Sequence, residues 1–358
     1  MSLIVEIEKK LNDKLLQVAF STEENKGITG ILGASGCGKS MTLKCIAGIE
    51  TPDKGRIVLN GRVLFDSEKK INVSVQKRRV GYLFQNYALF PNMTVEENIT
   101  AALRYHPDQK KRKMSREELK SRAEDYMKLF HIMDVRDSYP AKLSGGQQQR
   151  AALARIFASE PEVLMLDEPF SAMDAFLKER LQLELLQILE NYQKDILMVT
   201  HSRDEIYRFC KTMLIIEDGR QAGYGSTMEV FENPCTIAAA KLTGCKNIEK
   251  IERISDHEMW LPGWNTTLKV KAVIPEYATH IGIRAHYLRE AKEEQKENCV
   301  ECRNGRILED PFELVVVFDR NVWWKISKEV WQQEHRERLP ERLEIPEESI
   351  LYLEGSEC

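Results

Sequence analysis

Residues Gly33–Ser40 read GASGCGKS, a glycine-rich stretch that ends in a lysine and a serine. Glycines let successive backbone N–H groups curl around a phosphate, and a helix that starts directly afterwards points its positive end at the same anion. Lys39 adds a mobile positive charge, and the Ser40 hydroxyl can ligate Mg²⁺. The stretch lies between the apolar run GITGIL and the helical period MTLKCIAGI. This context predicts a phosphate-binding loop rather than an ordinary glycine turn.

Two carboxylates and a histidine end two further apolar runs. The run VLMLDE places Asp167 and Glu168 at the end of a predicted buried strand, and DILMVTH places His201 at the end of another. Because ligands of parallel sheets gather at the carboxyl ends of the strands, we expect these side chains beside the phosphate loop. Asp167 is expected near the metal, Glu168 where it can orient or deprotonate a water, and His201 against the γ-phosphate. A structural role is the alternative for each residue taken alone.

The octapeptide LSGGQQQR, Leu143–Arg150, places two glycines and three glutamines where a helix is about to begin. Flexible residues are a poor choice for the interior of a helix. At a helix N-terminus, however, they let backbone N–H groups approach an anion closely. Taken alone, the segment predicts a helix start whose ligand is not identified.

These residues need a sheet and helices to position them. In residues 1–234, β-rich runs alternate with helical periods, which predicts an α/β domain with a largely parallel sheet. The charged segment DQKKRKMSREELKSRAEDYMKLF has apolar residues at helical intervals, so we expect a solvent-facing helical insertion at about 100–158. In residues 235–358, strand-like pieces such as LKVKAVI and ELVVVFD alternate with turn signals and predict a small β-barrel domain.

The composition narrows the classes of function. The chain has 358 residues, 42% hydrophobic and 30% charged, as expected for about two globular domains. A net charge of −4 gives no broad basic field, which argues against a nucleic-acid partner. The sequence contains no run of about 18 apolar residues, so no membrane span is predicted. Glu6 and Glu8 argue against a secretory signal. The eight cysteines are expected as free thiols, because the pair Cys299 and Cys302 lacks the second pair of a zinc ribbon.

Six motifs occur together and in one order. On the basis of these motifs, the first two thirds of the chain resembles the ATP-binding subunit of ABC transporters. The motifs are GASGCGKS, LFQ at Leu83–Gln85, LSGGQ at Leu143–Gln147, LMLDEP at Leu164–Pro169, SAMD at Ser171–Asp174, and His201. The resemblance implies a P-loop ATPase fold that hydrolyses ATP to ADP and phosphate.

The resemblance also implies roles for single residues. The implied catalytic residues are Lys39, Glu168 and His201, and the implied Mg²⁺ ligands are Ser40, Gln85 and Asp167. The nucleotide is implied to be held by Gly33, Ala34, Ser35, Gly36, Cys37, Gly38, Lys39, Ser40, Met41, Gln85, Ser144, Gly145, Gly146, Gln147 and Asp174.

In that family the LSGGQ segment serves the other subunit. The resemblance therefore implies a head-to-tail homodimer that sandwiches two nucleotides. In it, Ser144, Gly145 and Gly146 close over the γ-phosphate bound to the partner subunit's phosphate loop, and Asp174 lies across the same interface.

The stretch from VLNGRVLFDSEKK to KRRVGYLFQ is similar to the importer branch, and most similar to the subunit that energises molybdate uptake. The C-terminal part, with TGCKNI and IGIRAHYL, resembles an oligonucleotide-fold-like regulatory domain. Implied partners are integral membrane permease subunits, which we expect to dock near Gln85, Asn86 and Tyr87, and indirectly an extracytoplasmic solute-binding protein. The implied location is peripheral, on the cytoplasmic face of the cell membrane.

Several alternatives stay open from the sequence. Sulfate, iron, a polyamine or a sugar are the alternatives for the transported solute, because the ATPase core is nearly blind to the cargo. From another class, a soluble ABC ATPase would act on nucleic acid or ribosomes, although the chain offers one ATPase core and no basic tail. A pure ATP-binding switch is disfavoured by the presence of Glu168 and His201.

Two finer expectations concern the nucleotide site. Cys37 lies beside helix-terminal N–H groups, which predicts a lowered thiol pKa. The resulting hypothesis is that alkylation blocks hydrolysis and that bound ATP protects the thiol. The family stacks adenine on an aromatic residue upstream of the first strands, where EKKLNDKLLQVAF offers Phe20 in a predicted strand. Apolar contacts to the base are the alternative.

Overall fold

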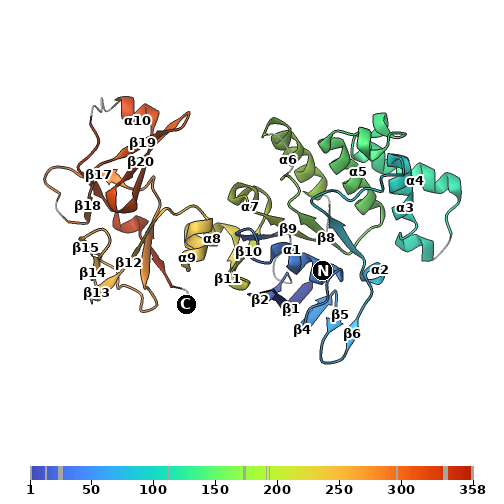
Figure 1. The fold of residues 1–358 in the computed structure, drawn as a ribbon, viewed down its shortest axis with the longest axis horizontal. Coiled ribbons are helices and arrows are strands. Elements are labelled where there is room, and N and C mark those ends of the chain that lie inside the picture. Colours follow the sequence, from blue (N-terminus) through green and yellow to red (C-terminus); the bar gives the residue numbers. More distant parts are fainter. Residues whose placement is uncertain are drawn as a thin grey trace. The chain divides into compact units, whose positions relative to one another are not determined.

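A computed structural model describes residues 2–12, 14–22, 27–110, 113–171, 175–190, 192, 194–295, 297–333 and 338–355, with the backbone alone for 109–110 and 175–177. The chain divides into two units, Met1–Thr227 and Met228–Cys358 (Figure 1). This division falls earlier in the chain than the expected boundary between residues 234 and 235, which stays a prediction.

An eleven-stranded sheet organises the first unit, in the order β6-β5-β4-β1-β2-β11-β10-β3-β9-β8-β7. Neighbours from β10 to β7 are parallel, whereas β1, β2, β4, β5 and β6 pair antiparallel with one another. Between these halves, β11 pairs antiparallel with β10 and parallel with β2. The expected largely parallel sheet is therefore found only in the half that carries the motifs. The strands are β1 (Leu3–Leu11), β2 (Lys14–Ser21), β3 (Ile28–Gly33), β4 (Lys54–Leu59), β5 (Arg62–Asp66), β6 (Ile71–Asn72), β7 (Val80–Leu83), β8 (Val163–Asp167), β9 (Asp195–Thr200), β10 (Thr212–Glu217) and β11 (Arg220–Ser226).

The parallel half is buried on both faces, which explains its continuous apolar runs. Every residue of β3, β8 and β9 is buried. Their apolar side chains share one core with the inner face of the antiparallel strands and with α1 (Lys39–Ala47). The guanidinium of Arg78, fully buried at the end of α2 (Val75–Arg78), donates to the carbonyls of Cys45 and Ile46 in the last turn of α1. The helix that follows the phosphate loop is thus fixed at its far end.

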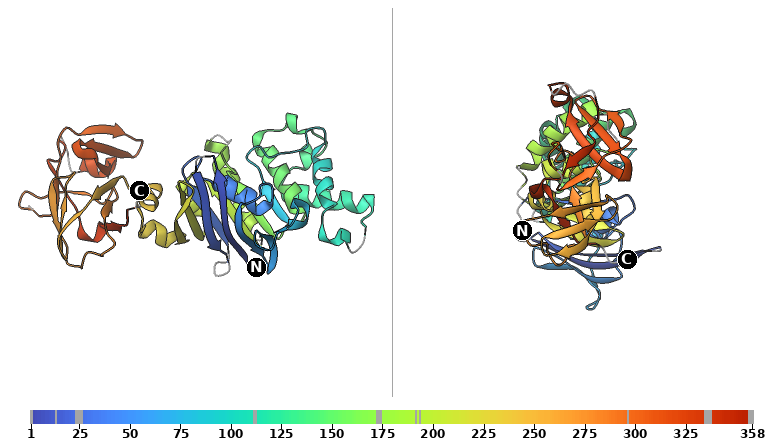
Figure 2. Two further views of the ribbon diagram at one scale, coloured as in Figure 1. Left: turned by 60° about the horizontal axis from the view of Figure 1, so that its bottom comes forward. Right: turned by 90° about the vertical axis from the view of Figure 1, so that its left-hand side faces the viewer.

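The helical insertion is present as three packed helices, α3 (Val95–Leu103), α4 (Arg116–Leu129) and α5 (Gly145–Ala158) (Figure 2). Each begins with a capping box, in which the first side chain and the one three residues later satisfy each other's backbone N–H groups. The pairs are Thr94 with Glu97, Ser115 with Glu118, and Ser144 with Gln147. The remaining helices of this unit are α6 (Ala175–Glu190) and α7 (Arg203–Phe209).

The second unit holds four three-stranded antiparallel sheets around one apolar core that includes Trp264 and Trp324. The sheets are β12 (Asn247–Lys250), β16 (His280–Ile283) and β23 (Leu351–Leu353); β13 (Glu252–Ser255), β14 (Glu258–Leu261) and β15 (Thr266–Lys269); β17 (Arg289–Glu290), β22 (Arg342–Glu344) and β18 (Cys299–Glu301); and β19 (Arg306–Glu309), β20 (Glu313–Phe318) and β21 (Val322–Ser327). The helices are α8 (Thr227–Glu232), α9 (Ile237–Leu242) and α10 (Lys328–Gln333). Among the described residues no ladder joins one sheet to the next, so a closed barrel stays a prediction.

Candidate nucleotide site

The phosphate loop connects the end of β3 to the start of α1. Gly36 and Gly38 adopt left-handed φ angles of 78° and 111°, which a residue with a side chain rarely adopts. A side chain at Gly33 would lie 2.3 Å from the carbonyl oxygen of Ile216, whereas one at Gly36 would meet nothing within 4 Å. The loop is therefore tightly packed on its inner side and open at Gly36, where a phosphate can approach the backbone.

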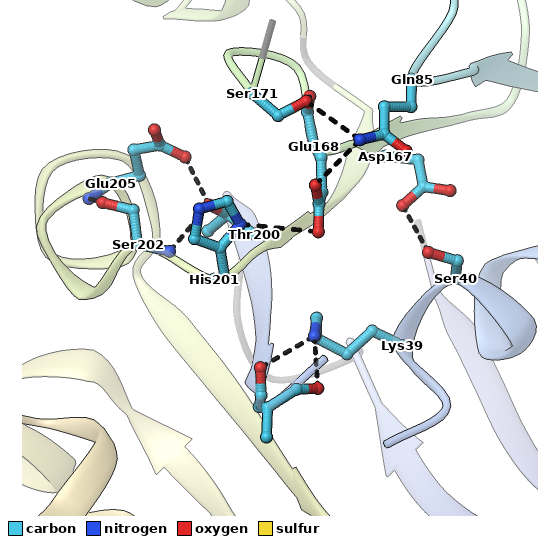
Figure 3. A network of polar contacts seen from close by, with 12 residues as sticks. Lys39, Ser40, Gln85, Asp167, Glu168, Ser171, Thr200, His201, Ser202 and Glu205 are labelled. Carbon is cyan, nitrogen blue, oxygen red and sulfur yellow. Dashed lines mark hydrogen bonds and ion pairs between the residues drawn. The ribbon is translucent and has the colours of Figure 1, made fainter. Parts of the chain in front are cut away.

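Lys39 is held over this loop by its own backbone. Its Nζ donates to the carbonyl oxygens of Gly33 and Ala34, both at 2.8 Å, and the residue is 5% exposed (Figure 3). A buried ammonium group is costly unless it is paired or hydrogen-bonded. A bound phosphate would offer Lys39 a stronger, charge-assisted partner at the same place.

Asp167 joins the phosphate loop to the end of β8. Its Oδ1 accepts from the Ser40 hydroxyl at 2.8 Å (Figure 3). Its Oδ2 accepts from the Tyr82 hydroxyl at 2.7 Å. Burial, followed by the hydrogen bond to Asp167, raises the pKa of Tyr82 well above its usual range, so the phenol stays a donor. The predicted pair Ser40 and Asp167 is thus adjacent, and Tyr82 is a supporting residue that the sequence motifs did not indicate.

Glu168 lies between Gln85 and His201 at the ends of three neighbouring strands. Its Oε2 accepts from Gln85 Nε2 at 3.3 Å, and its Oε1 lies 3.6 Å from His201 Nδ1 (Figure 3). Gln85 also donates to Ser171 Oγ at 3.4 Å. Glu168 itself has a φ of 48°, an uncommon conformation for a residue with a side chain, and such backbone strain concentrates at functional sites.

A buried polar network holds the segment around His201. Thr200 Oγ1 donates to Glu205 Oε2 at 2.5 Å and accepts from the backbone N–H of Ser202 at 3.0 Å. The other oxygen of Glu205, a residue 4% exposed, pairs with Lys178 Nζ at 2.5 Å. This network ties the end of β9 to α7 and to α6. Thr200, Glu205 and Lys178 are not predicted by the sequence motifs, because no phosphate-binding motif contains them.

The predicted LSGGQ residues lie apart from this network. Ser144 caps α5, and Ser144 and Gln147 satisfy each other's backbone N–H groups at 3.3 and 3.0 Å. Ser144 and Gly145 are exposed and Gly146 is buried, and a side chain at Gly145 would meet nothing within 4 Å. In the described residues of one chain, their hydrogen bonds are made within α5 and its cap and not to the phosphate loop.

Two other predicted residues lie in the phosphate loop and on the helix that follows it. Ser35 is exposed in the phosphate loop, and Met41 is partly buried on α1 against the core. Asp174 lies outside the described residues. The structure therefore brings together Lys39, Ser40, Gln85, Asp167, Glu168 and His201 and leaves the predicted LSGGQ residues on a separate surface.

The expectation that Cys37 has a lowered pKa is wrong. The thiol is 4% exposed on the crowded inner side of the loop, and its Sγ would lie 2.6 Å from a side chain at Gly33. Burial raises the pKa of Cys37 above the ordinary thiol value, and this effect outweighs the opposing charge of Lys39. The helix N-terminus was correctly located, but the thiol is packed away from solvent.

The aromatic residues that the sequence offered near the nucleotide belong to the core. Phe20 is 5% exposed in β2 and packs on Tyr224, with ring centroids 6.3 Å apart. Tyr87, expected in a permease-docking surface, is 6% exposed, whereas Asn86 is exposed. Phe20 is therefore buried in the sheet, and the apolar-contact alternative for the base stays a prediction.

A strand, a glycine loop and a helix that carry Lys39 and Ser40, with Asp167 hydrogen-bonded to that serine, define a P-loop nucleotide-binding site. The family model described as "ABC transporter" matches residues 15–171. The spermidine/putrescine import ATP-binding protein PotA of Bacillus cereus is 38% identical over 245 residues, which cover 68% of this chain and 71% of that protein. The chain therefore belongs to the ABC transporter ATP-binding proteins.

Two other relatives match over slightly less of this chain. PotA of Oleidesulfovibrio alaskensis is 39% identical over 61% of this chain and 55% of its own length. The sulfate/thiosulfate import ATP-binding protein CysA of Synechococcus elongatus is 37% identical over 63% of this chain and 62% of its own length. The matched stretch thus spans just over half of the first of these proteins.

A solved structure supports the fold. A dimeric post-hydrolysis state of the ATP-binding cassette MJ0796 bound to ADP and Pi has a TM-score of 0.52 and 26% sequence identity to this chain. It covers 63% of this chain and 99% of that chain. The P-loop ABC ATPase fold is thereby confirmed. In the part of the chain that the structure describes, no helix is long and apolar enough to cross a bilayer.

Proposed function

We propose that this chain is the ATP-hydrolysing subunit of an importer that moves a small charged solute through a membrane permease. The observation that carries the proposal is the position of Glu168, whose two carboxylate oxygens face Gln85 and His201 at the mouth of the phosphate loop. A general base must lie within hydrogen-bonding reach of the proton that it takes, directly or through one water. In the proposal, a water held between Glu168 and a γ-phosphate on the loop meets that condition.

The residues around Glu168 have distinct roles in this proposal. Lys39 exchanges its two carbonyl partners for phosphate oxygens and stabilises the charge that develops there. His201 orients the water and the γ-phosphate from the opposite side of Glu168. Ser40, Gln85 and Asp167 would hold Mg²⁺, which fits a set of hydroxyl, amide and carboxylate oxygens. When bound, the ion neutralises phosphate charge.

The proposed active unit is a homodimer, because within one described chain the hydrogen bonds of Ser144 and Gln147 are made in α5 and its cap and not to the phosphate loop. The exposed N-terminus of α5 suits an anion presented by a second subunit. Support comes from the similar MJ0796 structures, which are dimeric. Ser144→Arg places bulk at this exposed cap. We expect it to abolish turnover while ATP binding to the monomer is retained; loss of monomer binding would contradict the proposal.

For the cargo, the comparisons favour the alternatives over molybdate. The relatives named above are described as importers of spermidine and putrescine or of sulfate and thiosulfate, and none of them as a molybdate importer. We therefore propose a polyamine importer, with sulfate as the second candidate. The test is solute-dependent uptake by the complex of this chain with its co-purifying permease, in proteoliposomes supplied with ATP and each labelled solute. Uptake of molybdate alone would contradict this proposal.

The remaining parts of the proposal follow from the importer assignment. The chain is proposed to bind peripherally at the cytoplasmic face of the membrane, with permease subunits as direct partners and an extracytoplasmic solute-binding protein as an indirect one. The second unit is proposed as a small β-barrel regulatory domain. Stable association with ribosomes or DNA, in place of a membrane complex, would favour the soluble ATPase alternative.

A further inference from the structure

The turn that follows Glu168 is anchored by three different elements. The backbone N–H of Glu168 donates to the carbonyl of Val199 in β9 at 2.9 Å. Phe170, which is 1% exposed, packs against the ring of the last residue of α7, with centroids 5.5 Å apart. The third anchor comes from the helical insertion, where Gln149 Nε2 donates to the carbonyl oxygen of Pro169 at 3.1 Å. The turn that carries the proposed base is therefore bonded to α5.

The amide of Gln149 is buried, with the residue 2% exposed, and only one end of it is bonded. Because the carbonyl of Pro169 can only accept, the amide must direct an N–H group there and its oxygen elsewhere. That oxygen, Oε1, is buried and has no hydrogen-bond partner among the residues that the structure describes. An unpaired buried oxygen costs stability, and an apolar side chain of the same size would avoid that cost. The bond to Pro169 therefore explains the amide better than the packing of α5 does.

The backbone at Glu168 is in an unfavourable conformation. Its φ of 48° is uncommon for a residue with a side chain, and a residue before a proline normally adopts an extended conformation with negative φ. Such a conformation persists only where the surroundings fix it. Loss of the Gln149 anchor should therefore let the backbone relax. The carboxylate of Glu168 would then leave its place between Gln85 and His201 (Figure 3).

One helix joins this anchor to an exposed surface. Gln149 lies five residues after Ser144, the residue that caps α5, which is about 7.5 Å along the helix axis. A hydrogen-bonded helix of this length moves as a unit. An anion that binds at the N-terminus of α5 and shifts the helix would therefore also shift Gln149, and through it the carbonyl of Pro169.

We infer that Gln149 is a positioning residue of the ATPase, which transmits the position of α5 to the backbone of Glu168 through the carbonyl of Pro169. The inference rests on the proposed function, because it takes Glu168 as the base and the N-terminus of α5 as a phosphate contact. It adds a route by which a phosphate at the cap of α5 controls the placement of the base. Gln149 acts through the backbone and not on the reacting atoms.

Replacement of the amide by an apolar side chain tests the inference. Gln149→Met keeps the length of the side chain and removes both the donor and the unpartnered oxygen. Turnover at saturating ATP should fall by about 10- to 100-fold, the loss expected from a small misplacement of a catalytic group, while the KM for ATP changes by less than about twofold. Parent-like turnover in this variant would overturn the inference.

A second buried glutamine of the same unit provides the matched control. Gln182 is 5% exposed on α6, and its amide oxygen accepts from Arg208 of α7 at 3.3 Å. Gln182→Met removes a buried amide and its hydrogen bond without changing the contact to Pro169. It should keep turnover within about twofold of the parent chain. An equal loss of turnover in Gln149→Met and Gln182→Met would show that any buried glutamine has this effect, and would overturn the inference.

A double-mutant cycle separates positioning of the base from a general loss of stability. If Gln149 acts through Glu168, Gln149→Met should change the residual turnover of Glu168→Gln by less than about twofold. The same fold-loss in both backgrounds would overturn the inference. The proposed function is judged separately, because it fails on undiminished turnover in Glu168→Gln alone.

Hydrogen exchange gives a readout that needs no change at Gln149. In the Glu168→Gln chain, ATP should slow the exchange of the backbone N–H groups in the first turn of α5 and of those of Phe170 and Ser171. Ser144→Arg in the same chain should remove both effects. Slower exchange in α5 without any change at Phe170 and Ser171 would show that the helix does not transmit its position to the turn, and would overturn the inference.

Discussion

The two units of this chain bury their polar groups differently. In the first unit, charged side chains such as Lys39, Asp167 and Glu205 are buried, and each is held by hydrogen bonds or an ion pair. In the described residues of the second unit, no charged side chain is buried, and the core is built around Trp264 and Trp324. Buried charge is costly unless it is paired. The first unit therefore buries charged groups at a cost in folding stability, and the chemistry of the candidate site explains why it does so. The second unit is stabilised by the packing of its apolar core.

The largest effect expected from this contrast is loss of the base. Glu168→Gln keeps the shape of the side chain and removes its ability to accept a proton, so turnover of ATP should fall by about 10²–10⁴-fold. ATP binding, measured by fluorescence titration, should persist. The matched control is Glu249→Gln in the second unit, where the carboxylate accepts from the backbone N–H of Gly263 at 3.0 Å. Undiminished turnover in Glu168→Gln would show that another group is the base.

The core of the second unit should respond to a loss of packing alone. Trp324 is 2% exposed and donates from its indole N–H to the carbonyl of Leu288 at 3.1 Å. Trp324→Ala should lower the free energy of unfolding of this unit by about 3–5 kcal/mol. The neighbouring Trp323 is only partly buried, so Trp323→Ala is the matched control and should cost less.

Unfolding in denaturant, calorimetry and ATP binding are measured for the parent chain and for both variants. We expect the Trp324→Ala transition of the second unit to move to lower denaturant while nucleotide binding by the first unit is kept. Equal loss of ATP binding in this variant would contradict the division into separately stabilised units.

Removing an ion pair should likewise cost more stability in the first unit than in the second. Lys178→Met leaves the carboxylate of Glu205 buried without its ion pair, which should cost about 1–3 kcal/mol of stability and lower the turnover through the segment around His201. Lys178→Arg should retain both the stability and the turnover of the parent chain. The control is Lys328→Met, which removes a pair with the exposed Glu309 at 2.7 Å and should cost less than about 1 kcal/mol. Equal losses of stability in Lys178→Met and Lys328→Met would contradict the expected difference between the two units.

The same contrast explains which features the sequence could predict. The P-loop, Asp167, Glu168 and His201 sit at strand ends and helix starts, so short contiguous motifs place them without knowledge of the whole fold. Their proximity in the structure follows from the parallel order of β3, β9 and β8. The antiparallel half of the sheet was missed, because strands with one buried face carry no phosphate-binding motif.

Residues that act through burial were beyond the reach of those motifs. Tyr82 and Glu205 support the site from neighbouring elements. Tyr82 is 85 residues from Asp167 along the chain, and Glu205 pairs with Lys178 of another helix, so no short motif contains either pair. Cys37 illustrates the opposite error. Its neighbours along the chain indicated a positive helix end, whereas its neighbours in space exclude water. In the second unit, strand patterns predicted β structure but could not give the order of the four sheets.

The smallest expected effect concerns this thiol and a cysteine of the second unit. Burial raises the pKa of Cys37, so at pH 7 its thiolate fraction is smaller than that of an ordinary thiol, and it grows as the pH rises. Cys235, which is exposed, should therefore react first with iodoacetamide, as followed by peptide mass mapping, while ATP turnover stays unchanged. Raising the pH should narrow the difference between the two rates. Modification of Cys37 at pH 7 as fast as that of Cys235 would mean that the loop opens often enough for the helix N-terminus, and not burial, to control its reactivity.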